Sequence, residues 1–209
     1  MSIFHRTPKA PWKKYYGKIN KDIVVPDISM YQLVKNRAEE VSNYNAIDYF
    51  GKKITYKDLI REIDRAARAF RCYGIRTGDI VTICMPNTPE GIMSFYALNK
   101  IGAVVNMMHP LSSEEELKYG INLLKSEYLL VMDMVFNKID NIKEELNLQR
   151  IIYVSVSESM DKVIKLGYKL TKGFKVKKPY GENVISWSSF ISKAKYNKEE
   201  IIDNNKGDD

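Results

Sequence analysis

The sequence predicts an α/β fold in which helices flank a mostly parallel, doubly wound sheet. From residue 80 onwards, short apolar runs rich in β-branched residues alternate with segments of helical periodicity, an order typical of strand–helix–strand crossovers. These runs lack the polar–apolar alternation of a half-exposed strand, so we expect both faces of the sheet to be covered. Right-handed crossovers would complete a Rossmann-like layout.

The segments before residue 80 predict one helix, a small β-hairpin and a longer helix. Four residues at helical spacing indicate a helix over 29–41, namely Tyr31, Val34, Ala38 and Val41. Two β-prone runs, at 46–50 and 54–56, lie on either side of Gly51-Lys-Lys, which predicts a hairpin turn. An apolar face over 56–73, followed by Gly74, predicts an amphipathic helix with a glycine cap.

From residue 80 the expected elements form one regular series. The expected strands cover 80–85, 103–108, 128–132 and 151–155. Three helices are expected between these strands. The first begins at Thr88 and Pro89 and ends at Ile101, the second runs through Leu124, and the third covers about 136–146. The second of these helices has two candidate capping boxes, Ser112 with Glu115 and Ser113 with Glu116, and the sequence leaves the choice open.

Outside this core we expect two terminal segments. Residues 1–27 are rich in Pro, Lys and aromatic residues and predict an extended basic arm that lies on the body. Residues 28–198 would form the folded subdomain, and 199–209 would form a polar tail without core positions.

The net charge of +7 is unevenly distributed, which argues against a nucleic-acid partner. Residues 1–21 carry six Lys/Arg and no Asp/Glu, and 161–178 carry seven Lys and one Asp. The remaining residues hold 20 Lys/Arg and 25 Asp/Glu. A nucleic-acid-binding protein would show its basic charge on one coherent face of the fold, so we expect no nucleic acid to bind.

Cysteine content and hydropathy indicate a cytoplasmic protein. The two cysteines, Cys72 and Cys84, form no C-x-x-C pair and fall in apolar patterns, so we expect both to be buried thiols. No run approaches the roughly 18 apolar residues of a membrane span.

The lysine-rich stretch DKVIKLGYKLTKGFKVKK at 161–178 fits a strand or a helix. It could be a solvated basic excursion, or it could make weak peripheral contact with an anionic membrane surface.

The turns after the expected strands lack a phosphate cradle. The sequence contains neither G-x-G-x-x-G nor G-x-x-x-x-G-K-[ST]. With only His5 and His109 and no cysteine pair, no metal site is expected. We predict no catalytic and no cofactor-binding residue, and we name His109 and Asn87 as candidate pocket contacts because each follows a strand. For both, a loop residue that bonds only to its own turn is the competing interpretation.

Six segments in this order resemble the N-terminal part of the adenylate-forming, AMP-binding enzymes, which include acyl-CoA synthetases, peptide-synthetase adenylation domains and luciferases. They are ITYKDL at 54–59, RCYGIRTGDIV at 71–81, MPNTPE at 85–90, LNKIGAVVNMMHP at 98–110, SEEEL at 113–117 and YLLVMD at 128–133. The lysine-rich stretch followed by VISW at 184–187 is most similar to bacterial fatty-acid–CoA ligases.

The resemblance implies an ATP-dependent, AMP-forming acid–CoA ligase that uses ATP, Mg²⁺ and CoA in its full-length form. In that family the phosphate loop follows a segment like 199–209, and the nucleotide contacts and the mobile C-terminal domain lie further on. We therefore expect this chain to be inactive alone and to have as partners the remainder of the synthetase and a carboxylic acid, which the resemblance implies to be a fatty acid. The alternatives are a non-enzymatic Rossmann-like binding module or the partner subunit of a split synthetase.

Overall fold

A computed structural model describes residues 11–18, 26–171, 179–197, 201–203 and 205–207. Its centre is a five-stranded parallel sheet in the order β4-β3-β5-β6-β7. The strands are β3 (Ile80–Cys84), β4 (Val104–Met108), β5 (Tyr128–Met132), β6 (Arg150–Val154) and β7 (Val184–Ser186). The predicted α/β class is confirmed, and β7 is a strand that the sequence did not reveal.

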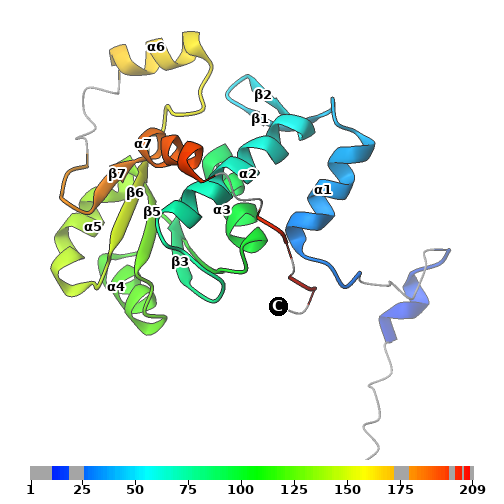
Figure 1. The fold of residues 1–209 in the computed structure, drawn as a ribbon, viewed down its shortest axis with the longest axis horizontal. Coiled ribbons are helices and arrows are strands. Elements are labelled where there is room, and N and C mark those ends of the chain that lie inside the picture. The colour runs from blue at the N-terminus through cyan, green and yellow to red at the C-terminus, as the bar shows by residue number, and fades with distance from the viewer. Residues whose placement is uncertain (1–10, 19–25, 172–178, 198–200, 204, 208–209) are drawn as a thin grey trace, which may run out of the picture.

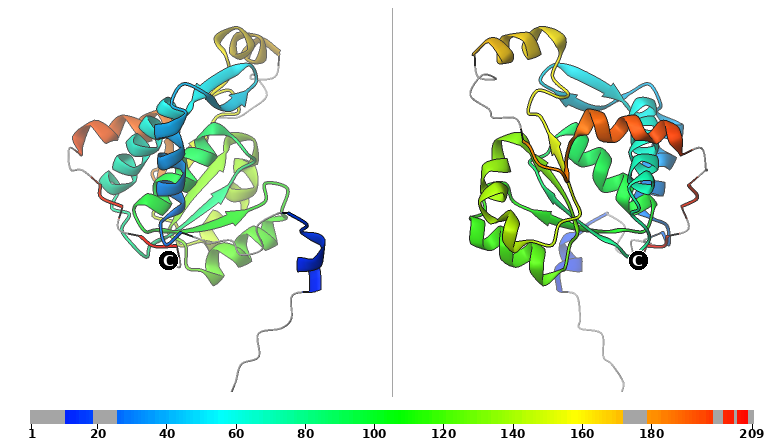
Figure 2. Two further views of the ribbon diagram at one scale, coloured as in Figure 1. Left: turned by 90° about the vertical axis from the view of Figure 1, so that its right-hand side faces the viewer. Right: turned by 60° about the vertical axis from the view of Figure 1, so that its left-hand side comes forward.

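Helices cover both faces of the sheet (Figures 1 and 2). One face carries α2 (Tyr56–Cys72), α3 (Pro89–Lys100) and α7 (Trp187–Ser192), with α1 (Met30–Glu40) packed outside them. The other face carries α4 (Glu114–Leu123) and α5 (Phe136–Ile142). Short 3₁₀ helices lie at Pro11–Tyr15 (η1), Asp133–Val135 (η2), Lys143–Glu145 (η3) and Lys193–Tyr196 (η5).

The core lies where α2 and α3 meet the central strands. All five residues of β5 are buried, and α2 presents Leu59, Ile63 and Phe70 to the same core. Burial of such side chains stabilises the fold by about 1.5–3 kcal/mol each. The rings of Phe70, Tyr73 and Trp187 surround Phe190, which joins α7 to α2.

β4 departs from the expected burial on both faces. Val104 is 51% exposed and Met107 is 53% exposed. The expectation was wrong for this strand because β4 is the last strand on its side of the sheet, with β3 as its one described neighbour.

Local details settle several open points. The capping box is Ser113 with Glu116, since each side chain bonds to the backbone N–H of the other residue. Thr88 caps α3, and Pro89 begins that helix, as predicted.

The hairpin consists of β1 (Asn45–Tyr49) and β2 (Lys52–Thr55). Its turn is Phe50-Gly51, so the two lysines predicted in the turn belong to β2.

Two other expectations need correction. Cys84 is buried, but Cys72 is exposed at the end of α2, where its thiol faces the Lys193 carbonyl oxygen at 3.3 Å. Within the basic arm, Pro11–Tyr15 form η1 instead of an extended chain, and Trp12 and Tyr15 are exposed. The rest of that arm, 1–10 and 19–25, lies outside the described residues.

The expected polar tail makes defined contacts. Ile201 packs against the core, which contradicts the expectation of no core positions. The Asn205 amide donates to the carbonyl oxygens of Asn99 and Lys100 at 2.8 and 3.1 Å. The tail is therefore bound to the end of α3.

The lysine-rich stretch forms a helix, α6 (Lys162–Thr171), in its described part, while 172–178 lie outside the described residues. No described helix is long and apolar enough to cross a bilayer.

Candidate functional site

The loops after β3, β5 and β6 meet at the carboxyl edge of the sheet, and α6 projects beyond this edge (Figure 2). From β3 the chain passes to β4 on one side and then to β5 on the other side. The strand order therefore reverses between β3 and β5, the place where open parallel sheets form their ligand crevices.

Glu90 is a buried carboxyl group beside this reversal point. It lies in the first turn of α3, is 2% exposed, and accepts a hydrogen bond from the hydroxyl of Ser159. Burial raises the pKa of the Glu90 carboxyl, and the hydrogen bond from Ser159 offsets part of that rise. Burial and the nearby Glu90 also raise the pKa of Tyr49 in the hairpin.

Asp133 is the corresponding group after β5. It is 9% exposed and accepts a hydrogen bond from the backbone N–H of Val156 at 3.3 Å. Burial raises the pKa of this carboxyl as well. Tyr168 of α6 lies near it, since burial and Asp133 raise the pKa of Tyr168.

These two carboxyl groups hold the loop after β6 in place. Glu90 binds Ser159 and Asp133 binds the backbone at Val156, so the loop 155–159 is fastened to α3 and to β5. Sequence reasoning missed both carboxylates, because their partners lie 69 and 23 residues away. As placed, they can accept hydrogen bonds or hold a proton at the edge of the crevice.

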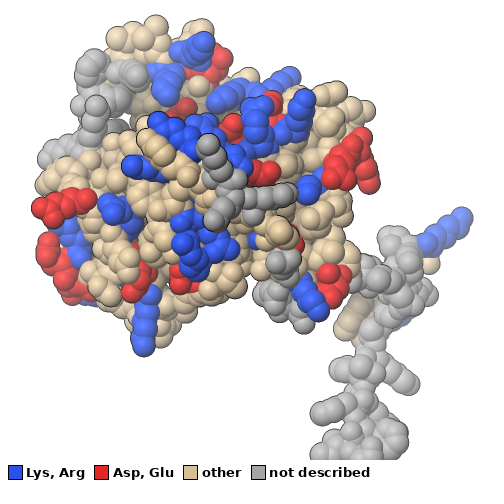
Figure 3. Space-filling view, in the orientation of Figure 1, with Lys and Arg blue, Asp and Glu red and all other residues tan. Residues whose placement is uncertain are grey.

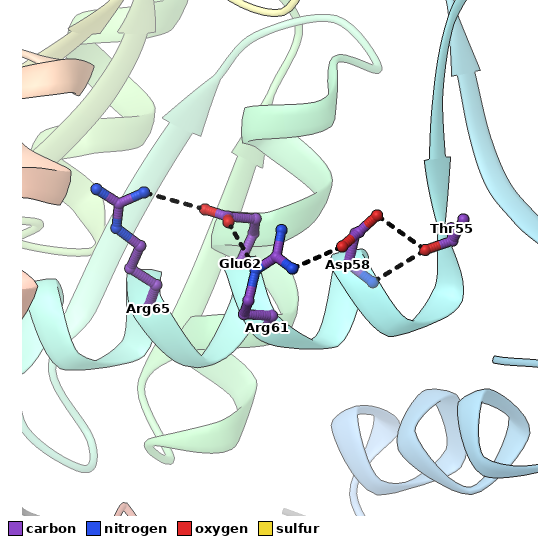
Figure 4. Close-up of polar contacts among 5 residues, drawn as sticks. All are labelled: Thr55, Asp58, Arg61, Glu62 and Arg65. Atoms are coloured by element: carbon purple, nitrogen blue, oxygen red, sulfur yellow. Dashed lines mark hydrogen bonds and ion pairs between the residues drawn. The ribbon is translucent and has the colours of Figure 1, made fainter. Parts of the chain in front are cut away.

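A cavity of about 440 Å³ opens beside Glu90, between the hairpin, α2 and α7. Its polar wall is a ladder on α2 (Figure 4): Arg61 is 2.7 Å from Asp58, and Arg65 is 3.4 Å from Glu62. Thr55 caps the same helix. Acidic side chains lie among the basic ones on this face (Figure 3). Exposed ion pairs of this kind contribute about 0–1 kcal/mol each to the stability of the fold. The ladder is therefore a solvated surface, and both arginines in it are already paired with carboxylates.

The two candidate pocket contacts lie on neighbouring loops but have different surroundings. Asn87 lines an apolar cavity of about 360 Å³ with Pro86, Phe95 and Met107. His109 does not line that cavity, and its Nδ1 accepts a hydrogen bond from the Leu111 N–H at 3.1 Å. The histidine ring therefore stabilises its own turn, whereas the asparagine borders a space that a ligand or another chain segment could fill.

A third polar centre lies away from the carboxyl edge, among α1, α2 and α3. Asp64 accepts hydrogen bonds from the Tyr31 hydroxyl at 2.8 Å and from the Lys100 ammonium at 2.7 Å. The ammonium also lies 4.5 Å from the centre of the Tyr31 ring. Burial, with Asp64 adding to it, raises the pKa of Tyr31 strongly. The network joins three helices, and sequence reasoning did not detect it.

Within the described residues, no cluster of three or more His, Cys, Asp or Glu side chains could hold a metal ion. The carboxyl edge therefore carries buried hydroxyl and carboxyl groups, with an apolar cavity next to them.

Known proteins are similar to this chain in sequence and in fold. The sequence profile of the AMP-binding enzymes matches residues 34–184. A long-chain-fatty-acid–CoA ligase of Bacillus subtilis is 26% identical over 195 residues, which cover 93% of this chain and 35% of the relative.

Two solved structures have the same fold. An anthranilate–CoA ligase in complex with anthranoyl-AMP superposes with a TM-score of 0.65 at 16% identity, covering 81% of this chain and 29% of that one. A coronafacic acid ligase of Pectobacterium brasiliense gives 0.64 at 23% identity, covering 83% and 31%. The chain thus spans about a third of the length of these proteins. Because the family profile matches most of its residues, the chain belongs to the AMP-binding enzyme family.

Proposed function

We propose that this chain is the N-terminal part of an ATP-dependent, AMP-forming ligase that joins a fatty acid to CoA. The observation that supports this most is the similarity to the Bacillus subtilis long-chain-fatty-acid–CoA ligase, which extends over 93% of the chain. ATP, Mg²⁺ and CoA would be the cofactors and co-substrate of the complete enzyme, and a fatty acid would be its carboxylic acid.

In the proposed reaction the fatty acid carboxylate attacks the α-phosphate of ATP and pyrophosphate leaves. The CoA thiol then loses its proton and attacks the carbonyl carbon of the acyl-adenylate. The bond between that carbon and the phosphate oxygen breaks, and AMP leaves. Both steps require donors that stabilise charge on a transferring phosphate. The 209-residue sequence contains no glycine-rich phosphate loop. We therefore propose that this chain alone binds Mg·ATP weakly and does not turn it over.

A chimera tests the substrate class. The 195 matched residues of the Bacillus subtilis ligase are replaced by those of this chain, and acyl-CoA formation is measured with palmitate and with acetate. We expect kcat/KM to be higher for palmitate by at least tenfold, which corresponds to about 1.4 kcal/mol of differential binding. An active chimera that prefers acetate would contradict the fatty-acid assignment.

A further proposal concerns the membrane surface, because α6 presents an exposed apolar face. Val163, Leu166 and Leu170 lie at helical spacing and are 78%, 61% and 65% exposed. Lys165 on the inner side donates to the Glu158 carbonyl oxygen at 3.3 Å, so this helix turns its apolar side outwards. An apolar face with lysines beside it suits an anionic lipid surface.

Vesicle binding tests that proposal. We expect the chain to sediment with vesicles containing phosphatidylserine, and to do so less as salt rises. Replacing Val163, Leu166 and Leu170 with serine should abolish the binding while leaving the circular dichroism unchanged. Equal binding of this variant and the wild type would refute a role for α6.

A further inference from the structure

The turn of the β1–β2 hairpin contains a residue that its backbone does not favour. Tyr49 pairs with Lys52, so Phe50 and Gly51 form a two-residue turn. Both turn residues have positive φ, +47 for Phe50 and +79 for Gly51. Turns of this type favour Asn-Gly or Asp-Gly, because a bulky side chain is strained at positive φ. Backbone preference therefore does not account for a phenylalanine at this position.

Packing against the core does not account for it either. The Phe50 side chain is 55% exposed, and its ring meets that of Tyr49 edge-on, with 4.8 Å between the ring centroids. Lys52 and Lys53, which follow the turn, are exposed as well. An exposed aromatic ring next to exposed lysines suits the boundary between lipid and water, where the ring enters the headgroup region and the lysines meet anionic lipids.

The hairpin lies beside α6. Both elements are at the same end of the molecule in Figures 1 and 2. Burial raises the pKa of Tyr49, and the nearby Glu90 and Tyr168 add to that rise, so Tyr49 is close to the α6 residue Tyr168. The turn at Phe50 is therefore next to the helix that carries the exposed apolar face.

The charge of these two segments fits an anionic surface. Residues 44–53 and 161–178 together carry nine Lys and two Asp. Their net charge of +7 equals that of the whole 209-residue chain, so the remaining residues are neutral in sum. Lysines beside exposed apolar side chains are complementary to a bilayer that contains acidic phospholipids.

We propose that the turn of the β1–β2 hairpin makes a second contact with an anionic bilayer, in which the Phe50 ring enters the headgroup region and Lys52 and Lys53 meet acidic lipids. This proposal rests on the proposed membrane contact of α6 and deepens it. One helix alone could roll about its own axis on the surface, whereas two neighbouring contacts fix the orientation of the body. Docked in this way, the chain turns the carboxyl edge of the sheet, beyond which α6 projects, towards the bilayer.

Vesicle titration of single-residue variants tests the proposal. Phe50→Asn removes the ring and introduces a residue that tolerates positive φ, so its thermal stability should not fall. We expect this variant to partition at least ~10-fold more weakly into vesicles of phosphatidylcholine and phosphatidylserine.

Tyr44→Asn is the matched control. Tyr44 is 70% exposed and lies at the base of the same hairpin, where its carbonyl oxygen accepts a hydrogen bond from the Tyr56 N–H at 3.0 Å. Because this ring is far along the hairpin from the turn, its replacement should change the partition by less than ~2-fold.

Fluorescence quenching locates the ring. Phe50→Trp and Tyr44→Trp each add one indole to the two tryptophans of the chain, Trp12 and Trp187. With lipids brominated near the headgroup, we expect quenching of the emission that Phe50→Trp adds to the wild-type signal, and no quenching of the emission that Tyr44→Trp adds.

Four outcomes would overturn the proposal: equal partition of Phe50→Asn and the wild type, equal weakening by both asparagine variants, equal quenching of both tryptophan variants, or self-association without vesicles that Phe50→Asn abolishes. Binding that is lost on serine replacement of the α6 apolar residues but unchanged in Phe50→Asn would refute the hairpin contact alone. No vesicle binding by the wild type would refute both membrane contacts and leave the ligase assignment, which the chimera tests in solution.

Discussion

The Tyr31–Asp64–Lys100 network allows a quantitative test of what holds the helices together. In Asp64→Ala the Lys100 ammonium loses its ion-pair partner, and the Tyr31 hydroxyl loses its acceptor. Removing one member of a fully buried ion pair costs about 3–5 kcal/mol. Here the Lys100 side chain is 11% exposed and that of Asp64 is 31% exposed. Partial solvent screening therefore reduces the expected loss to about 2–3 kcal/mol.

Lys100→Met should cost less than Asp64→Ala. Asp64 then still accepts a hydrogen bond from Tyr31 and remains in contact with water, so we expect a loss of about 1 kcal/mol. The double variant leaves no unpaired charge, and its cost should fall short of the sum of the single costs by about 1–2 kcal/mol.

Urea denaturation followed by circular dichroism measures all four free energies of unfolding. The reasoning fails if Asp64→Ala costs less than about 0.5 kcal/mol, or if the two single costs add without any coupling.

Two further predictions concern Gly102 and Glu90. Gly102 has φ +74, and an added Cβ there would lie 2.9 Å from Cγ2 of Thr77, whereas Gly78 has φ +85 and open space around it. Gly78→Ala should therefore lower the free energy of unfolding by about 1 kcal/mol, and Gly102→Ala should lower it by more. Equal losses of the two variants in thermal denaturation would exclude a steric contribution at Gly102. Because the pKa of Glu90 is raised in the folded state, the native protein binds the extra proton, and stability should fall as pH rises from the ordinary value of 4.5 through the folded pKa. Glu90→Gln keeps an acceptor for Ser159 and should flatten that fall in denaturation curves taken across this pH range; an unchanged slope would exclude Glu90 as its source.

The regular part of the fold could be predicted because it depends on local pattern. The apolar face of α2, the Thr88 and Pro89 start of α3, and the fully apolar β5 are each specified within a few residues. Their alternation fixes a parallel sheet.

The misplaced features depend on neighbours that are distant in sequence. The exposure of β4 follows from its place at the edge, which only the strand order determines. Cys72 lies in an apolar pattern yet ends α2 at the surface.

The candidate site could likewise be predicted only where it depends on local sequence. Asn87 and His109 could be named because each follows a strand, but only the structure shows that Asn87 borders a cavity and that His109 bonds to its own turn. Sequence reasoning assigned Glu90 no role, and its hydrogen-bond partner, Ser159, lies 69 residues away.

ATP–pyrophosphate exchange by the 209-residue chain tests most directly the proposal that this chain does not turn over ATP without the rest of the ligase. With Mg·ATP and palmitate we expect no exchange above background from the chain alone, and exchange that depends on palmitate once the rest of the ligase is added. Palmitate-stimulated exchange by the chain alone would contradict the account.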